Sequence, residues 1–376
     1  MPSGGKDKGT GRYGRQQGMG RLRRANVKHA GRVGGWERHD EDAEVFDLHG
    51  EITRSSHAGE RLISRFNRLV ALGQGTVAAG EPAEISEVRP GLTMVRFADG
   101  SQEPAAIRRA LEKRMVGVRN TLAVGDRVRV EREAGDRVIV AIEPRRNQLA
   151  RSDSHNRSLE HILAANVDLL IAVAAVHDPD FKHGFVDRAL LVAAAHGIAA
   201  CVAVTKRDLG DPSPMLALYG GLGLPVVAVD ARDPQDPGVA ELRRLMVGRA
   251  CVCAGQSGVG KSSLINACYP GIGARVGLVA DEGFGRHTTT SARAYVLPGG
   301  GRLIDTPGIR ECTIGGLGPV DVALLYPDLA AHQPGCRFPD CTHRHEPDCA
   351  VLTALEDGKV TPSRYWSYRS IVDGEG

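Results

Sequence analysis

The sequence predicts a multidomain fold in which a small antiparallel β-barrel is followed by an α/β domain with a mostly parallel sheet and by a small cysteine-rich domain. Short alternating runs between glycine-rich turns indicate the barrel, and apolar runs that alternate with helical stretches indicate the α/β domain. A chain of 376 residues is long enough for two or three domains. We expect an N-terminal extension at residues 1–66, the barrel at 67–150, the α/β domain at 151–315 and the cysteine-rich domain, with a C-terminal helix, at 316–376.

Basic residues are concentrated at the N-terminus. The whole chain carries 48 Lys and Arg residues against 45 Asp and Glu residues. Residues 1–36 contain nine basic residues, one acidic residue and ten glycines. Such a segment buries too little apolar surface to offset the entropy of ordering, so we expect a disordered basic arm. The arm is either a solvated tail that aids solubility or an RNA-binding segment attracted to phosphates.

The apolar segments predict neither membrane insertion nor secretion. The two longest, at residues 159–176 and 189–204, are interrupted by polar residues and do not match a bilayer span of about 20 residues. The N-terminus has no apolar core of a signal peptide. We therefore expect a cytoplasmic protein, with no membrane partner, whose eight cysteines form no disulfides. Coiled-coil heptads are absent from the sequence, and we expect a monomer.

The barrel is predicted from short alternating runs at residues 75–78, 92–97, 126–130 and 137–142. An oligonucleotide-binding (OB-fold) barrel is a candidate because the region is basic. Its cations include Arg89, Arg96, Arg108, Arg109, Lys113, Arg114 and Arg119. Residues 144–153 are expected to form a linker into the α/β domain.

A phosphate-binding loop follows the apolar run at residues 250–254. Glycines let backbone N–H groups curl around phosphates at a helix N-terminus, Lys261 neutralises the β- and γ-phosphate oxygens, and the Ser262 hydroxyl binds Mg²⁺. The spacing G-x-x-x-x-G-K-S in a strand–loop–helix context predicts binding of ATP or GTP. The residues of this loop are Gly255, Gln256, Ser257, Gly258, Val259, Gly260, Lys261, Ser262 and Ser263.

A second motif, Asp305-Thr306-Pro307-Gly308, ends another predicted strand. Asp305 is placed to reach Mg²⁺ through water, and the N–H of Gly308 can face the γ-phosphate. Alone this pattern is only a turn, but together with the phosphate loop it predicts a switch that senses the γ-phosphate.

Thr205-Lys206-Arg207-Asp208 matches the guanine-reading pattern [NT]-K-x-D at the end of a third predicted strand. Asp208 can accept hydrogen bonds from guanine N1–H and the exocyclic amine, while the stem of Lys206 covers the base. The alternative is that Asp208 only caps a helix in a polar loop and has no role in nucleotide binding. In this sequence the guanine-reading motif comes before the phosphate loop, whereas in ordinary GTPases the phosphate loop comes first. The sequence therefore predicts a circularly permuted P-loop GTPase domain.

Residues 283–290 lie between the phosphate loop and Asp305 and are flanked by glycines. A threonine from such a loop completes the Mg²⁺ shell when GTP is bound, and we favour Thr289, with Thr288 as second choice. Ile309 stands where many GTPases have the glutamine that orients the attacking water. His287 is the nearest candidate for that task, although a loop histidine that only packs or binds phosphate is equally plausible.

Cys336, Cys341, His343 and Cys349 offer four soft ligands within fourteen residues. Four protein ligands leave no open coordination position, so this spacing predicts one structural Zn²⁺ rather than a catalytic one. His345 is an alternative fourth ligand. The cysteines outside this cluster that lie on predicted strands or a helix are better explained as buried apolar residues; they are Cys201, Cys251, Cys253 and Cys268.

Together these motifs resemble the circularly permuted, ribosome-small-subunit-dependent GTPases that act in late small-subunit assembly. The likeness rests on the permuted motif order, on Gly285-Arg286-His287-Thr288-Thr289-Thr290, on the cysteine cluster with Glu346-Pro347, and on the tail Arg364-Tyr365-Trp366-Ser367-Tyr368. It departs from the family at Val229-Asp230-Ala231, where a Ser-Ala pair is usual and a backbone N–H reads guanine O6.

The resemblance implies a GTPase that binds the small (30S) ribosomal subunit and its 16S rRNA, with slow intrinsic hydrolysis that the subunit stimulates. It implies GTP and GDP as ligands, Mg²⁺ on Ser262, Thr289 and Asp305, and further assembly factors as partners. It also favours the RNA-binding interpretation of the N-terminal arm. A competing hypothesis is an RNA-binding scaffold for ribosome assembly that holds GTP as a structural ligand.

Overall fold

The computed structural model describes residues 80–114, 122–152, 160–272, 292–306 and 317–374. The N-terminal extension lies outside these ranges, and so does the run predicted at residues 75–78. The boundaries expected at residues 66, 150 and 315 stay predictions. Within the described part of the chain, no helix combines the length and apolar character needed to cross a bilayer.

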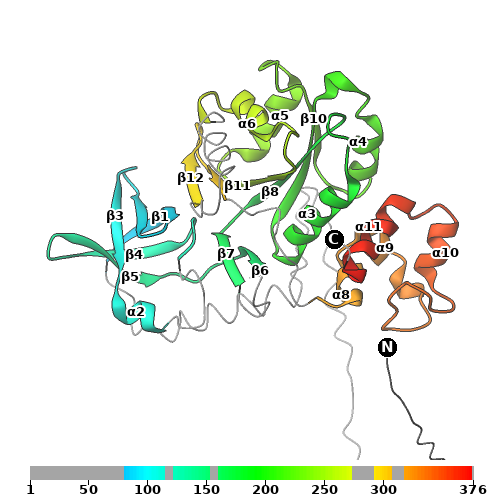
Figure 1. The fold of residues 1–376 in the computed structure, drawn as a ribbon, viewed down its shortest axis with the longest axis horizontal. Coiled ribbons are helices and arrows are strands. Elements are labelled where there is room, and N and C mark those ends of the chain that lie inside the picture. Colours follow the sequence, from blue (N-terminus) through cyan, green and yellow to red (C-terminus); the bar gives the residue numbers. More distant parts are fainter. Residues whose placement is uncertain (1–79, 115–121, 153–159, 273–291, 307–316, 375–376) are drawn as a thin grey trace, which may run out of the picture. The chain divides into compact units, whose positions relative to one another are not determined.

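The first described region is a closed five-stranded barrel (Figure 1). Its strands pair around the ring in the order β1-β2-β3-β5-β4, and β4 pairs with β1 to close it. Ile85, Val95, Val128 and Ile139 point inward and are fully buried. The five strands agree with the five-stranded barrel of an OB-fold. The elements are β1 (Glu81–Arg89), β2 (Leu92–Phe97), β3 (Gln102–Ile107), α2 (Arg109–Arg114), β4 (Arg127–Glu133) and β5 (Asp136–Ile142).

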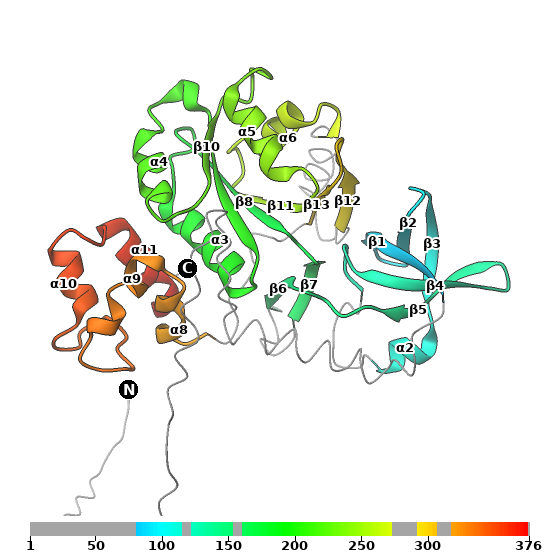
Figure 2. The same ribbon diagram turned by 180° about the vertical axis from the view of Figure 1, so that it is seen from behind.

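The α/β region has a sheet in the order β10-β9-β8-β11-β13-β12, parallel except for β12. Every residue of β8 is buried, as a strand covered on both faces requires. Helices lie on both sides of this sheet (Figures 1 and 2). The strands are β8 (Leu169–Ala175), β9 (Ala199–Thr205), β10 (Val226–Val229), β11 (Ala250–Gly255), β12 (Ala292–Val296) and β13 (Arg302–Asp305). The helices are α3 (His183–Ala195), η1 (Arg207–Leu209), α4 (Ser213–Gly220), α5 (Pro237–Met246) and α6 (Lys261–Cys268).

Two apolar cores fill the two faces of this sheet. One includes Val186 of α3 and Tyr219 of α4, and the other includes Val239 of α5 and Leu264 of α6. The second core also contains the cysteines that the sequence assigns to the interior. Cys201, Cys251 and Cys268 are buried there, and Cys253 packs against it while partly exposed.

The barrel and the α/β sheet are joined at a strand edge. β12 pairs antiparallel with β1 through Glu87 beside Arg293 and Val88 beside Ala292, so the eleven strands form one continuous sheet. Arg302 also contacts Glu84 across this junction at 2.8 Å. Backbone pairing and a charged contact therefore connect the two regions beyond the covalent chain.

The segment predicted as a linker is instead part of the folded structure. The Arg145 guanidinium is fully buried and donates to both carboxylate oxygens of Asp126 at 2.7 and 2.8 Å. The same segment contains β6 (Gln148–Ser152), which pairs antiparallel with β7 (Glu160–Ala165). Because a buried bidentate ion pair holds the start of this segment, it cannot act as a free hinge.

The C-terminal region is a small helical unit around an apolar core that includes Tyr326, Val351 and Tyr368 and to which α3 adds Leu191. It packs on α3 through Arg364, whose guanidinium contacts both oxygens of Asp328 at 2.9 Å and also contacts Asp187 of α3. The elements are α8 (Pro319–Leu324), α9 (Pro327–Ala330), η4 (Gln333–Gly335), α10 (Ala350–Glu356) and α11 (Pro362–Asp373).

Candidate nucleotide site and metal centre

The phosphate-loop sequence forms the turn between β11 and α6. Gly258 and Gly260 have φ of +79° and +83°, a left-handed conformation that favours glycine. A Cβ on Gly255 would lie 2.7 Å from the carbonyl oxygen of Val173, so a larger residue cannot fit there. Lys261 Nζ donates to the carbonyl oxygens of Gly255 and Gln256 at 2.8 and 2.6 Å. The loop thus presents backbone N–H groups and an ammonium at a helix N-terminus, an arrangement that binds phosphates.

Asp305 ends β13, the parallel neighbour of β11, and therefore lies at the same edge of the sheet as the phosphate loop. Burial raises the pKa of Asp305 to about 6, and the Lys261 ammonium opposes this shift. The next residue, Thr306, has a buried Oγ1 with no hydrogen bond from the described residues. A buried carboxylate and an unpaired buried hydroxyl are groups that a bound cation and phosphate would stabilise, so the site fits Mg²⁺ and a nucleotide.

The predicted base-reading residues follow β9 and contact the phosphate loop directly. Thr205 Oγ1 donates to the carbonyl oxygen of Val259 at 2.6 Å, and also contacts that of Ala174 at 3.2 Å. Lys206 has a φ of +55°, which turns the chain sharply, and its ammonium contacts Asp178. The hydrogen bond from Thr205 to Val259 therefore joins the base-reading element to the phosphate loop.

The Asp208 carboxylate is paired with Arg232 at 3.0 Å. Arg232 follows β10, whose last residue, Val229, lies beside Thr205, and its guanidinium also contacts Asp230 at 2.8 Å. The hydrogen bonds from Arg232 are the main cause that lowers the pKa of Asp230 to about 2. The loop that departs from the family pattern thus lies against Asp208, and Arg232 covers the carboxylate.

The four predicted metal ligands meet in one cluster. Their ligand atoms all lie within 4.8 Å of one another, and three of the four residues are buried. His343 Nδ1 is 3.4 Å from the sulfur of Cys349 and 3.6 Å from that of Cys336, and those two sulfurs are 3.9 Å apart. Two sulfurs about 2.3 Å from one tetrahedral ion lie roughly 3.8 Å apart, so the cluster fits Zn²⁺. The alternative ligand, His345, is exposed and lies outside the cluster.

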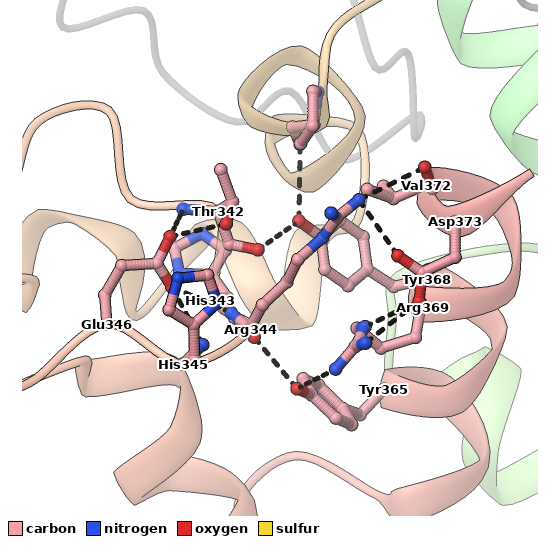
Figure 3. Close-up of polar contacts among 11 residues, drawn as sticks. Thr342, His343, Arg344, His345, Glu346, Tyr365, Tyr368, Arg369, Val372 and Asp373 are labelled. Carbon is pink, nitrogen blue, oxygen red and sulfur yellow. Dashed lines mark hydrogen bonds and ion pairs between the residues drawn. The ribbon is translucent and has the colours of Figure 1, made fainter. Parts of the chain in front are cut away.

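Side chains around the cluster hold its backbone (Figure 3). The Glu346 carboxylate accepts hydrogen bonds from the backbone N–H groups of Thr342, Arg344 and His345, at 2.7 to 3.1 Å. From α11, the hydroxyls of Tyr365 and Tyr368 donate to the carbonyl oxygens of His343 and Thr342 at 2.9 and 2.7 Å. The metal cluster and α11 are therefore one structural unit.

Comparison with known proteins decides the family. A family model described as RsgA GTPase matches residues 142–315. A small ribosomal subunit biogenesis GTPase RsgA from Azotobacter vinelandii is 42% identical over 263 residues, which are 67% of this chain and 74% of that protein. The chain belongs to the RsgA GTPase family.

Further relatives extend the match along the chain. An RsgA from Porphyromonas gingivalis is 37% identical over 295 residues, covering 75% of this chain and 93% of that protein. The crystal structure of YjeQ from Thermotoga maritima matches with a TM-score of 0.62 at 27% identity, over 78% of this chain and 98% of the other. YloQ, described as a circularly permuted GTPase, matches in fold with a TM-score of 0.60 at 23% identity, over 81% of this chain and 98% of the other. The predicted fold class and permuted order are confirmed.

Several predicted RsgA-family site residues lie outside the described residues: His287, Thr288, Thr289, Gly308 and Ile309. The structure places Asp305 and Asp208 at the sheet edge that carries the phosphate loop, and it separately brings the four metal ligands into one cluster, while the role of each residue stays a prediction. Sequence reasoning missed Arg232. The available signal was its position just after a strand that ends at the same sheet edge as Asp208.

Proposed function

We propose that this protein is a cytoplasmic, monomeric GTPase that binds the small (30S) ribosomal subunit and assists its late maturation. The observation that supports this most is the meeting of the phosphate loop, Asp305 and Asp208 at one edge of a sheet that continues through β12 into the barrel. Relatives named small ribosomal subunit biogenesis GTPases support GTP as the substrate and the small subunit as the partner in this proposal. Other assembly factors are further partners in this proposal.

In the proposed reaction the chain binds and orients GTP for attack by water. The N–H groups of residues 255–263 and the Lys261 ammonium hold the phosphates, and Gly308 faces the γ-phosphate. Ser262, Asp305 and Thr289 would hold Mg²⁺, which neutralises charge on the β- and γ-phosphates. His287 orients the attacking water, a role for which Ile309 has no suitable group.

Guanine recognition is assigned to Thr205, Lys206, Arg207 and Asp208. The hydrogen bond from Thr205 to Val259 supports this, because it ties the base element to the phosphate loop. The backbone N–H of Ala231 reads guanine O6. Arg232 lies on the Asp208 carboxylate and must move aside before the base can bind. Because Arg232 is 69% exposed, this movement disturbs no core packing.

Asp208→Asn is expected to weaken GTP binding by about 10- to 100-fold, because a charge-assisted hydrogen bond is worth roughly 1.5–3 kcal/mol. The variant is expected to gain affinity for xanthosine triphosphate, since the asparagine amide can donate to the C2 carbonyl of xanthine. Equilibrium titration with fluorescent nucleotides measures both. Asp211→Asn, an exposed aspartate of the same loop, is the control. Unchanged preference for GTP over ATP and xanthosine triphosphate in Asp208→Asn would refute the assignment.

Among the barrel cations singled out in the sequence, Arg109 and Lys113 are the described ones that stay available for RNA phosphates. Arg89 and Arg108 are paired with glutamates, and Arg96 donates to the carbonyl oxygen of Ala294. Arg109 and Lys113 are exposed one turn apart on α2, with no ion pair to the described residues. We therefore assign the barrel's contact with 16S rRNA to α2, whose cations are not neutralised by the barrel itself.

The subunit-dependent activity is tested by titrating purified small subunits into the protein and measuring phosphate release. GTP turnover is expected to rise at least about tenfold, because a partner that completes a GTPase site accelerates it by orders of magnitude. Large subunits serve as the control. A flat titration with small subunits would favour the alternative, an RNA-binding scaffold in which GTP is a structural ligand.

A further inference from the structure

A pocket of about 490 Å³ opens beside the phosphate loop. Gln256 and Ser257, the second and third residues of the loop, form one wall. Arg188 of α3 forms another, and Ser370 of α11 closes it from the C-terminal unit. None of its described lining residues is acidic. The pocket therefore presents a cation and polar groups next to the phosphate-binding turn.

Arg188 has no anionic partner among the described residues. It is half-buried and makes no hydrogen bond or ion pair there. Its neighbour Asp187 does not neutralise it, because Asp187 is engaged by Arg364 and by the hydroxyl of Tyr219 at 3.1 Å. Partly burying a guanidinium without an anion costs free energy, so such a residue fits a site that receives an anion.

We propose that Arg188 binds the terminal phosphoryl group of GTP during hydrolysis. This inference rests on the proposed GTP hydrolysis at the phosphate loop. Ser257 belongs to the turn that would hold the phosphates, and Arg188 shares its pocket. The guanidinium is a fixed fork of donors suited to phosphoryl oxygens, and it stays protonated throughout the reaction.

In the step itself, water oxygen forms a bond to the γ-phosphorus while the bond from that phosphorus to the β,γ-bridging oxygen breaks. The bonding electrons go to the β-phosphate of GDP, and the water proton leaves to phosphate or solvent. Arg188 transfers no proton; it donates hydrogen bonds to oxygens whose charge changes in the transition state. A built-in arginine would compensate in part for Ile309, which cannot hold the attacking water.

The test uses the full chain with Mg²⁺ and GDP, with and without aluminium fluoride, a mimic of the phosphoryl group in transfer. Arg188→Ala is expected to keep GDP affinity within about threefold, to lose fluoride-dependent trapping of GDP, and to reduce subunit-stimulated turnover by about 100-fold or more. Arg188→Met keeps the apolar stem and is expected to behave like Arg188→Ala. Lys182→Ala removes an exposed cation next to the same helix, outside the pocket, and is expected to match the wild type.

Two results would overturn the proposal. One is undiminished trapping and turnover in both Arg188 variants. The other is an equal loss of GDP binding and trapping in both, which would mean that Arg188 supports only the shape of the site. Failure of the proposed function gives a different result, because the wild type would then show no stimulation by small subunits while its trapping could still be compared with that of the variants.

Discussion

The Lys261→Ala variant is expected to lose GTP and GDP affinity by about two to four orders of magnitude, because each hydrogen bond to a charged group contributes roughly 1.5–3 kcal/mol. Lys261 Nζ now contacts two loop carbonyls, Gly255 and Gln256, and therefore lies within the phosphate-binding turn. Its ammonium also opposes the raised pKa of Asp305. Without it, the Asp305 carboxyl holds its proton to a higher pH, and the proton competes with Mg²⁺ more strongly at neutral pH.

Calorimetric titration with GDP at fixed Mg²⁺ measures this loss. Lys359→Ala is the matched control, because Lys359 is an exposed lysine whose partner is Asp357 in the C-terminal unit. Raising the pH removes the proton from Asp305 and should therefore restore the part of the GDP affinity of Lys261→Ala that depends on Mg²⁺. It should not restore the part that came from the lost contacts between Lys261 and the phosphates. Near wild-type affinity in Lys261→Ala would show that the turn does not bind phosphates as assigned.

The sequence predicts elements whose signals are local. β2 matches the run of alternating residues predicted for it. The phosphate loop lies directly after β11, as predicted, because the spacing of its glycines is enough to define that turn. β1 and β3 escaped detection since each carries charged residues and a proline and has few large apolar side chains. They are held as strands by pairing around the closed barrel, which links residues such as Glu81 and Val130 that are distant in sequence.

The same limit applies to the candidate site. Asp208 and the four metal ligands were found because each belongs to a short motif. Arg232 and Arg188 belong to no motif, and the C-terminal tail motif gives Arg364 no role. What these arginines contact depends on residues distant in sequence; Arg364 and Asp187 are 177 positions apart. Which arginines are neutralised and which remain available depends on the tertiary structure, so their roles follow only from the folded chain.

Removal of Zn²⁺ is expected to unfold the C-terminal unit while the α/β region stays folded. The ligand cluster lies inside that unit's small apolar core, next to Tyr365 and Tyr368, which hold the cluster backbone from α11. Burial raises the pKa of Cys341, so without a metal the thiol stays neutral and contributes no ion pair. Structural Zn²⁺ contributes about 10–16 kcal/mol of apparent binding free energy in small zinc domains, more than such a core supplies alone.

Cys341→Ser is therefore expected to lose its zinc and to expose the C-terminal unit to proteolysis, with cleavage within residues 317–374 and an intact α/β fragment. Metal analysis and mass spectrometry of limited digests measure both. His343→Ala should behave like Cys341→Ser, whereas His345→Ala should keep one zinc per chain, because His345 is exposed and outside the cluster.

Unfolding of the C-terminal unit would also remove Arg364 from Asp187, leaving a carboxylate on α3 without its buried cation. The digest pattern of the α/β fragment should then depend on GDP more strongly than in the wild type, since bound nucleotide stabilises only the folded form. Retention of zinc and of a protected C-terminus in Cys341→Ser would contradict the structural role assigned to the metal.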